Sequence, residues 1–103
     1  MKWGGTIDLL RYQTLPGVVL TCVCGEYMLV SAKSVRDKVP YMVQLNESSA
    51  FLWKRLSEGA DEPELEKAVM DEFEIEDIVQ ARSAIKGFLE QMLQNGLLLK
   101  EGE

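Results

Sequence analysis

Histidine is absent from the 103 residues of the chain, which removes the commonest general base and the commonest metal ligand. The two cysteines, Cys22 and Cys24, are too few for a disulfide scaffold or an all-cysteine zinc site. The sequence has no glycine-rich phosphate loop, and Ser48 and Ser49 have neither a histidine nor a nearby lysine to act as a base. We therefore expect no enzymatic activity, no cofactor and no metal site.

Long apolar runs are also absent. No run approaches the roughly 20 residues that a membrane-spanning helix needs, and no apolar segment follows the single positive charge near the N-terminus, so no signal peptide is predicted. Lysine and arginine number 11 against 17 acidic residues, which gives 11 − 17 = −6. A negative protein repels phosphate groups unless its positive charge is concentrated locally. The sequence therefore predicts a cytoplasmic protein that binds neither nucleic acid nor membrane.

The composition that remains is typical of a folded globular protein, because 47% of the residues are hydrophobic and 27% are charged. The length fits one domain with a single modest core. Residues 1–16 contain a pair of glycines, a short apolar pair and a proline, and we predict a partly ordered N-terminal arm there. The domain itself is expected over residues 17–103.

The first half of this domain has the pattern of a β-sheet. Val18–Val23 is rich in β-branched residues, a turn follows at residues 24–26, and residues 27–31 complete a hairpin. After a charged connection, residues 39–45 form the third predicted strand. Pro40 cannot donate a ladder hydrogen bond, so it places at least the start of this strand at a sheet edge or a bulge.

The second half has the boundary signals of helices. Asn46 is a good N-cap for the first helix, whose apolar residues recur at helical spacing as far as Leu56. Gly59 ends this helix. Asp61 and Glu64 then have the spacing of a capping box and begin the second helix.

The third predicted helix begins near Asp77, and its apolar stripe reaches Met92. Asn95 and Gly96 are a strong helix stop, and residues 97–99 form a short extended segment. Strands followed by helices are typical of the α+β class. We predict a three-stranded antiparallel β-sheet followed by a three-helix bundle of the winged helix-turn-helix type.

Three segments of the sequence resemble the PqqD family. Residues 41–53 form a strand followed by Leu-Asn, a turn of small residues and an apolar residue before Trp. The break at residues 57–59 before the next helix, and the Phe-Leu to Gly-Leu ending of residues 88–98, also match. The resemblance covers about residues 17–100. It implies a non-catalytic accessory protein in the biosynthesis of pyrroloquinoline quinone or of related ribosomally made, modified peptides.

Proteins of this family bind the leader segment of a precursor peptide and deliver it to a modifying enzyme, often a radical SAM protein. The leader pairs as an extra strand with the third strand and packs against the third helix. Carried onto this sequence, the resemblance implies the peptide-binding residues Val39, Tyr41, Met42, Val43, Gln44, Leu45, Arg82, Ile85, Lys86, Leu89 and Met92.

Each of these features also has a simpler structural interpretation. The third strand accepts a peptide by β-augmentation, or it is an ordinary edge strand. Arg82 and Lys86 hold acidic residues of a leader, or they lie on a solvated face with Lys86 paired to Glu90. Residues 58–77 carry a charge of 1 − 10 = −9. This run contacts a basic enzyme surface, or it is a solvated face near two helix N-termini.

Cys22 and Cys24 are two positions apart on a strand, so both are expected on one face. Without a histidine or a third thiol, core or half-buried packing is favoured over metal binding. Trp53 lies on an apolar stripe and is predicted to be a core residue.

Two other functions compete with peptide recognition: a winged-helix DNA-binding regulator, and an adaptor subunit that binds only a protein partner. A DNA reader clusters lysine and arginine on its recognition helix. Here Arg82 and Lys86 are balanced by Asp77 and Glu90. An exposed edge strand also permits self-pairing, so the chain is expected to be a monomer or a dimer.

Overall fold

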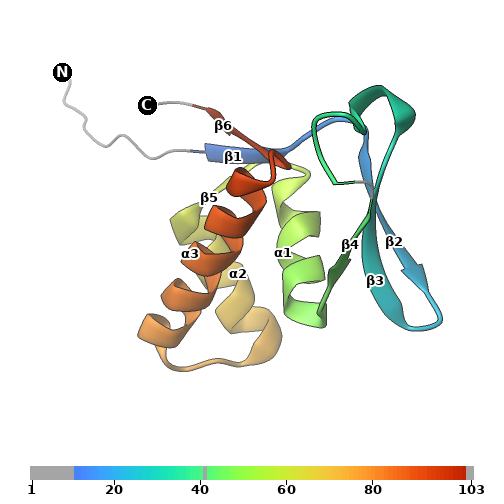
Figure 1. The fold of residues 1–103 in the computed structure, drawn as a ribbon. Coiled ribbons are helices and arrows are strands. Elements are labelled where there is room, and N and C mark those ends of the chain that lie inside the picture. The colour runs from blue at the N-terminus through green and yellow to red at the C-terminus, as the bar shows by residue number, and fades with distance from the viewer. Residues whose placement is uncertain (1–10, 41, 102–103) are drawn as a thin grey trace, which may run out of the picture.

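The computed structural model of the chain describes residues 11–40 and 42–101 (Figure 1). In chain order its elements are β1 (Arg11–Thr14), β2 (Val18–Val23), β3 (Glu26–Ser31), the 3₁₀ helix η1 (Lys33–Val35), β4 (Met42–Leu45), α1 (Glu47–Leu56), β5 (Ala60–Asp61), α2 (Glu62–Phe73), α3 (Ile78–Gln94) and β6 (Leu98–Glu101). The predicted α+β class, with a three-stranded antiparallel sheet and three helices, is confirmed.

The main sheet has the strand order β2-β3-β4. A two-residue turn joins β2 to β3, since Val23 pairs with Glu26 across it. Both turn residues have positive φ, 52° for Cys24 and 79° for Gly25, as a type I′ hairpin requires. The predicted hairpin is confirmed, and β2 has the bounds expected from its β-branched residues.

The third strand of this sheet is shorter than predicted. β4 begins at Met42, whereas Val39 precedes the strand and is buried in the core. The Ser31 hydroxyl donates a 2.7 Å hydrogen bond to the Pro40 carbonyl and so fixes the approach to β4. Tyr41 lies outside the described residues.

The helices have the N-cap residues that were predicted from the sequence. The Asn46 side chain accepts from the Ser49 backbone N–H at 2.8 Å, and the predicted capping box of Asp61 and Glu64 is complete. The Asp77 side chain caps α3. These caps satisfy backbone donors that helix starts otherwise leave unpaired.

Helix α1 lies between the main sheet and the pair formed by α2 and α3 (Figure 1). Its apolar stripe includes Leu56, which is fully buried, and Trp53, which is 3% exposed and confirms the predicted core position. Leu65 of α2 and Leu97 after α3 are also fully buried, so one continuous core joins the sheet to the helices.

A second sheet, with the order β5-β1-β6, was not predicted. Strand β1 lies within the segment assigned to the N-terminal arm, and it pairs along its length with β6. Residues 1–10 of that arm lie outside the described part. The sheet caps one end of the helical layer (Figure 1).

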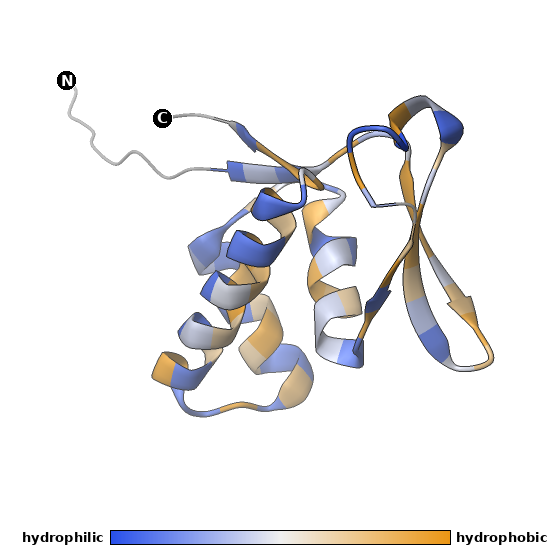
Figure 2. Ribbon diagram, viewed as in Figure 1, coloured by the Kyte–Doolittle hydropathy of each residue, from blue (hydrophilic) through white to orange (hydrophobic). Residues whose placement is uncertain are grey.

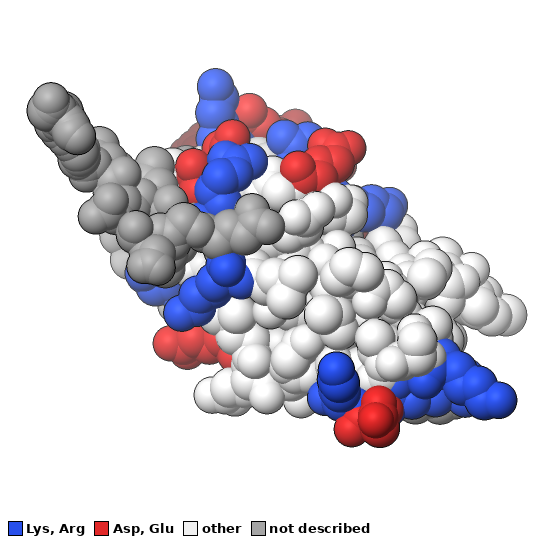
Figure 3. All heavy atoms as spheres, turned by 90° about the horizontal axis from the view of Figure 1, so that it is seen from above, with Lys and Arg blue, Asp and Glu red and all other residues white. Residues whose placement is uncertain are grey.

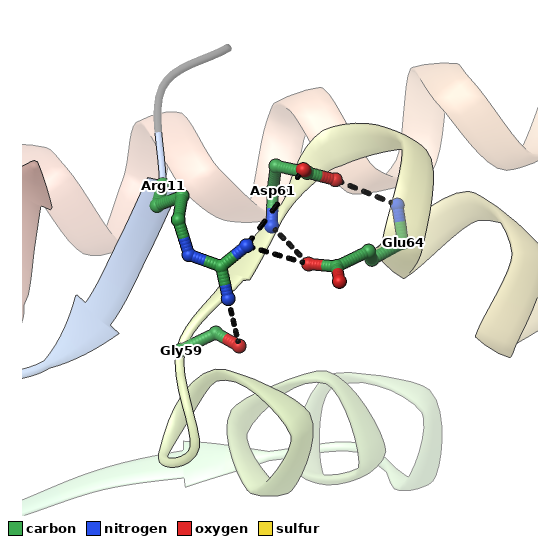
Figure 4. A network of polar contacts seen from close by, with 4 residues as sticks. All are labelled: Arg11, Gly59, Asp61 and Glu64. Atoms are coloured by element: carbon green, nitrogen blue, oxygen red, sulfur yellow. Dashed lines mark hydrogen bonds and ion pairs between the residues drawn. The ribbon is translucent and has the colours of Figure 1, made fainter. Parts of the chain in front are cut away.

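Arg11 ties β1 to the start of α2 (Figure 4). Its guanidinium donates to Glu64 Oε1 at 3.2 Å and to the Gly59 carbonyl at 3.0 Å. The Asp61 backbone N–H also donates to Glu64 Oε1, at 3.0 Å. The pKa of the Glu64 carboxyl is lower than its ordinary value. The hydrogen bond from the Asp61 backbone is the largest cause, and the positive charge of Arg11 adds to it.

The expected packing of the cysteines is wrong, because both Cys22 and Cys24 are exposed. Cys24 belongs to the turn and not to the strand, and Cys22 is the last but one residue of β2. The tip of this hairpin projects away from α1 (Figure 1), in agreement with the exposure of both cysteines.

Candidate functional site

Strand β4 forms one edge of the main sheet. Among the described strands β3 is its only partner, with Met42 to Leu45 paired to Val30 to Tyr27. The side chains alternate as expected for a strand: Met42 and Gln44 are exposed, Val43 is half-buried and Leu45 is buried. An edge of this kind presents backbone donors and acceptors to a further strand.

A pocket of about 520 Å³ lies where the start of α1, the end of α2 and the flank of α3 meet. Its deepest residues are apolar and include Leu52, Ile85 and Phe88, which are at most 6% exposed. None of the residues that line it is charged, although charged residues make up 27% of the chain. A concave, uncharged surface with apolar residues such as these in its lining is suited to an apolar side chain of a ligand.

The flank of α3 that lines this pocket differs from the rest of the helix surface. Its exposed residues are small or neutral: Gln80, Ser83, Ala84, Gly87 and Gln91. At Gly87 an added Cβ would meet no atom within 4 Å, so the glycine faces open space. The charged residues of the helix lie elsewhere, which leaves this flank open for close approach of another chain.

A second hollow, of about 450 Å³, follows along the same helix. It lies between residues 37–40, which lead into β4, and residues 93–96 at the end of α3. We define the β4–α3 groove as the edge of β4, the flank of α3 and these two hollows. Helix α1 lies between β4 and α3 (Figure 1), and its residues Ser48, Ser49 and Leu52 line the main pocket.

The structure brings together only part of the predicted site. Met42, Val43, Gln44 and Leu45 form the β4 edge. Val39 lines the second hollow but is 6% exposed, so its side chain belongs mainly to the core.

The five residues predicted on α3 lie in two other environments. Ile85, Leu89 and Met92 are 1%, 3% and 1% exposed, and of these Ile85 alone lines the main pocket. Arg82 Nε lies 3.0 Å from Glu66, and Lys86 Nζ lies 3.4 Å from Glu62. Both cations thus reach across to α2.

These ion pairs also bear on the acidic run at residues 58–77. Glu62 and Glu66 pair with α3, and Glu64 takes part in the cap of α2 and binds Arg11. Exposed pairs of this kind contribute little stability, about 0–1 kcal/mol each. With Arg82 and Lys86 paired to carboxylates, α3 offers no free cationic face for a DNA phosphate backbone.

Sequence reasoning missed the flank formed by Gln80, Ala84, Gly87 and Gln91. A signal for it exists, because these neutral residues recur at spacings of four, three and four along a helix whose charged residues, Arg82, Lys86 and Glu90, all lie outside this series. The apolar stripe identifies the buried face of α3. The neutral residues beside this stripe identify the exposed face that carries no charge.

Within residues 11–40 and 42–101, no three His, Cys, Asp or Glu side chains are grouped so that they could hold a metal ion. No helix in this described part has the length and apolar character needed to cross a membrane.

The described elements form a small α+β domain with an open sheet edge and a concave, uncharged helix flank. The family model of Coenzyme PQQ synthesis protein D (PqqD) matches residues 26–98, so the chain belongs to the PqqD family. This membership supports a role with protein partners in the synthesis of coenzyme PQQ. Comparisons with curated proteins and with solved structures gave no match.

Proposed function

We propose that this domain binds the leader segment of a precursor peptide in the β4–α3 groove and presents it to a modifying enzyme of the radical SAM type. The leader adds a strand to the free edge of β4 and lays side chains against the neutral flank of α3. The observation that carries the proposal is an uncharged pocket that begins at Asn46, the residue directly after a strand with one open edge. Membership of the PqqD family supports it.

The energetics of β4 explain why the pocket is needed. Its four residues allow about four backbone hydrogen bonds, each with a net value of about 0.5–1.5 kcal/mol. Ordering a flexible segment costs about 2–5 kcal/mol or more. Backbone pairing alone therefore leaves little net affinity. Burying one large apolar side chain adds about 1.5–3 kcal/mol, and the main pocket has the size and lining for one.

A titration followed by ¹⁵N-HSQC spectra tests this proposal. Synthetic leader peptides encoded beside the gene of this protein are added to the labelled domain, with scrambled peptides as controls. We expect shifts at Met42–Leu45 and along residues 80–91, and none on β2. The absence of shifts with every such leader contradicts peptide recognition and favours an adaptor that binds the enzyme alone.

A pair of proline substitutions locates the docking edge. Successive residues of a strand direct their backbone N–H groups to opposite sides, so one of Val43 and Gln44 donates toward β3 and the other toward the free edge. Val43→Pro and Gln44→Pro are therefore matched variants of one strand. We expect one of them to lose leader binding with its circular dichroism spectrum intact. If both folded variants bind as tightly as the wild type, the leader does not pair with β4.

A further inference from the structure

The corner between α2 and α3 has an exposed apolar surface. Ile78 and Val79, the first two residues of α3, are 41% and 69% exposed, and Val79 is the most exposed large hydrophobic residue of the described part. Helix formation does not require them, because β-branched residues are weak helix formers and Asp77 already caps this helix. Figure 2 shows the start of α3 as a hydrophobic segment beside hydrophilic residues of the preceding loop.

A hollow of about 310 Å³ lies next to this pair, between Ile78 and α2. Its apolar lining comes from Pro63, Met70 and Ile78. It shares no lining residue with the main pocket of the β4–α3 groove. We define the α2–α3 corner as residues 70–79 together with this hollow. The domain can therefore hold a leader in the groove and a second molecule at the corner at the same time.

Acidic residues flank the apolar surface of the corner. Residues 68–81 include five acidic side chains and no basic one, a charge of 0 − 5 = −5. The five are Asp71, Glu72, Glu74, Glu76 and Asp77. All five are exposed, and none forms an ion pair with a described residue. Lys67 is the one basic residue in the lining of the hollow.

This excess of negative charge is local. At the end of the molecule that carries β1 and β6, basic and acidic side chains are both present (Figure 3). Residues 11–46 hold four basic and two acidic side chains, 4 − 2 = +2. The α2–α3 corner lies at the opposite end from β1 and β6 (Figure 1). A positively charged partner is therefore attracted to the corner in preference to the rest of the surface.

The charge of the corner selects among possible occupants. A second copy of this chain would bring two acidic corners together, and nucleic acids and anionic membranes are repelled for the same reason. Within the described residues no acidic side chains are grouped so that they could hold a metal ion. An apolar centre with acidic flanks is complementary to a protein surface on which lysine or arginine surrounds an apolar side chain.

We propose that the α2–α3 corner docks a folded protein with such a basic, apolar-centred surface, and that the modifying enzyme provides it. This inference rests on the proposed function and adds the surface through which the enzyme is held. The position suits that role, because Ile75 and Gln80, on either side of the corner, line the main pocket. An enzyme docked at the corner therefore lies beside one end of the bound leader.

A pair of double substitutions tests the charge. The modifying enzyme encoded beside the gene of this protein is titrated by calorimetry with Asp71→Lys/Glu76→Lys and, as the matched control, with Glu58→Lys/Glu90→Lys. Both variants change the net charge equally, −6 + 4 = −2, at exposed positions. We expect the Kd for the enzyme to rise by about tenfold or more for the corner variant and by less than about threefold for the control.

A second pair of substitutions tests the apolar centre. Val79→Ser removes the most exposed apolar side chain of the corner, and Val19→Ser removes one of similar exposure, 61% against 69%, on β2. We expect Val79→Ser to raise the Kd for the enzyme by about fivefold or more, because a buried valine at the interface is lost. Val19→Ser should leave this Kd within about twofold of the wild type.

Titrations of the same variants with the leader peptide separate this proposal from the proposed function. All four variants should keep their circular dichroism spectra and bind the leader within about twofold of the wild type. Equal effects of the two double variants on enzyme binding, or no effect of either, overturn the corner as the docking surface and leave leader recognition intact. Loss of leader binding in the corner variants overturns it too, since the corner then belongs to the leader site. A wild-type protein that binds the leader but not the enzyme refutes the presentation step itself.

Discussion

Replacing Gly87 by leucine should make the domain more stable and at the same time weaken its peptide binding. Most substitutions that impair a binding site leave stability unchanged or lower it. Gly87 differs because it is exposed in the middle of α3 and lines the main pocket. An added Cβ meets no atom within 4 Å, so the first carbon of a new side chain faces open space.

The expected magnitudes follow from this placement. Glycine inside a helix costs about 0.5–1 kcal/mol relative to a good helix former such as leucine. For a domain of this size that difference raises Tm by about 2–8 °C. The leucine side chain occupies the space meant for an apolar anchor of the leader, whose burial is worth about 1.5–3 kcal/mol. The Kd for the leader should therefore rise by about 10- to 150-fold.

Differential scanning calorimetry and isothermal titration calorimetry measure the two effects separately. Gly87→Ala is the first control, because it gives the helix stabilisation with only one carbon in the groove. Glu90→Leu is the second, because Glu90 is exposed on α3 but does not line the pocket. Both control variants should bind the leader within about threefold of the wild type, a difference of about 0.6 kcal/mol.

A Gly87→Leu protein that is stabilised and still binds the leader at wild-type affinity would refute the placement of the peptide along this flank. A Gly87→Leu protein that loses stability would refute the claim that the position faces open space.

Two further perturbations test contacts that support the groove. Ser31→Ala removes the hydroxyl that donates to the Pro40 carbonyl and should lower the free energy of unfolding by about 1–3 kcal/mol in urea titrations. Ser57→Ala, which removes an exposed hydroxyl bound to a backbone carbonyl, is its control and should cost less than about 0.5 kcal/mol. Glu64→Gln should lower Tm at pH 7. Because the folded pKa of Glu64 is depressed, its carboxylate stabilises the fold above the unfolded pKa of about 4.3. The Tm difference should therefore shrink as pH falls below 4, and a constant difference down to pH 3 would contradict this account.

The sequence predicted those parts of the fold that depend on short-range chemistry. Asn46 and Asp61 cap helices because their side chains reach backbone N–H groups within three residues. The β2–β3 hairpin follows from β-branched residues on either side of a turn that tolerates positive φ at Cys24 and Gly25. In each case the residues that interact are close together in the chain.

Long-range pairing could not be predicted in the same way. β1 pairs with β6, from the opposite end of the chain, and neither strand has enough alternation in its four residues to indicate a partner. The neutral flank of α3 was not predicted for a related reason. An apolar stripe shows which face of a helix is buried, but which of its two flanks lies open depends on where α2 packs. Arg82 and Lys86 lie on the α2 side, where Glu66 and Glu62 receive them.

Edge strands are common in sheets, and apolar pockets are common between helices, so neither feature alone defines a peptide site. Their combination here is more specific. The strand supplies backbone bonds that any sequence can make, whereas the pocket selects a side chain, and its lining without charge excludes acidic and basic anchors. Gly87 and Ala84 add little side-chain bulk to the lining of the pocket, which leaves room on α3 for a bound segment. If a leader binds as we propose, its selectivity follows from the spacing between its paired backbone and its apolar anchor.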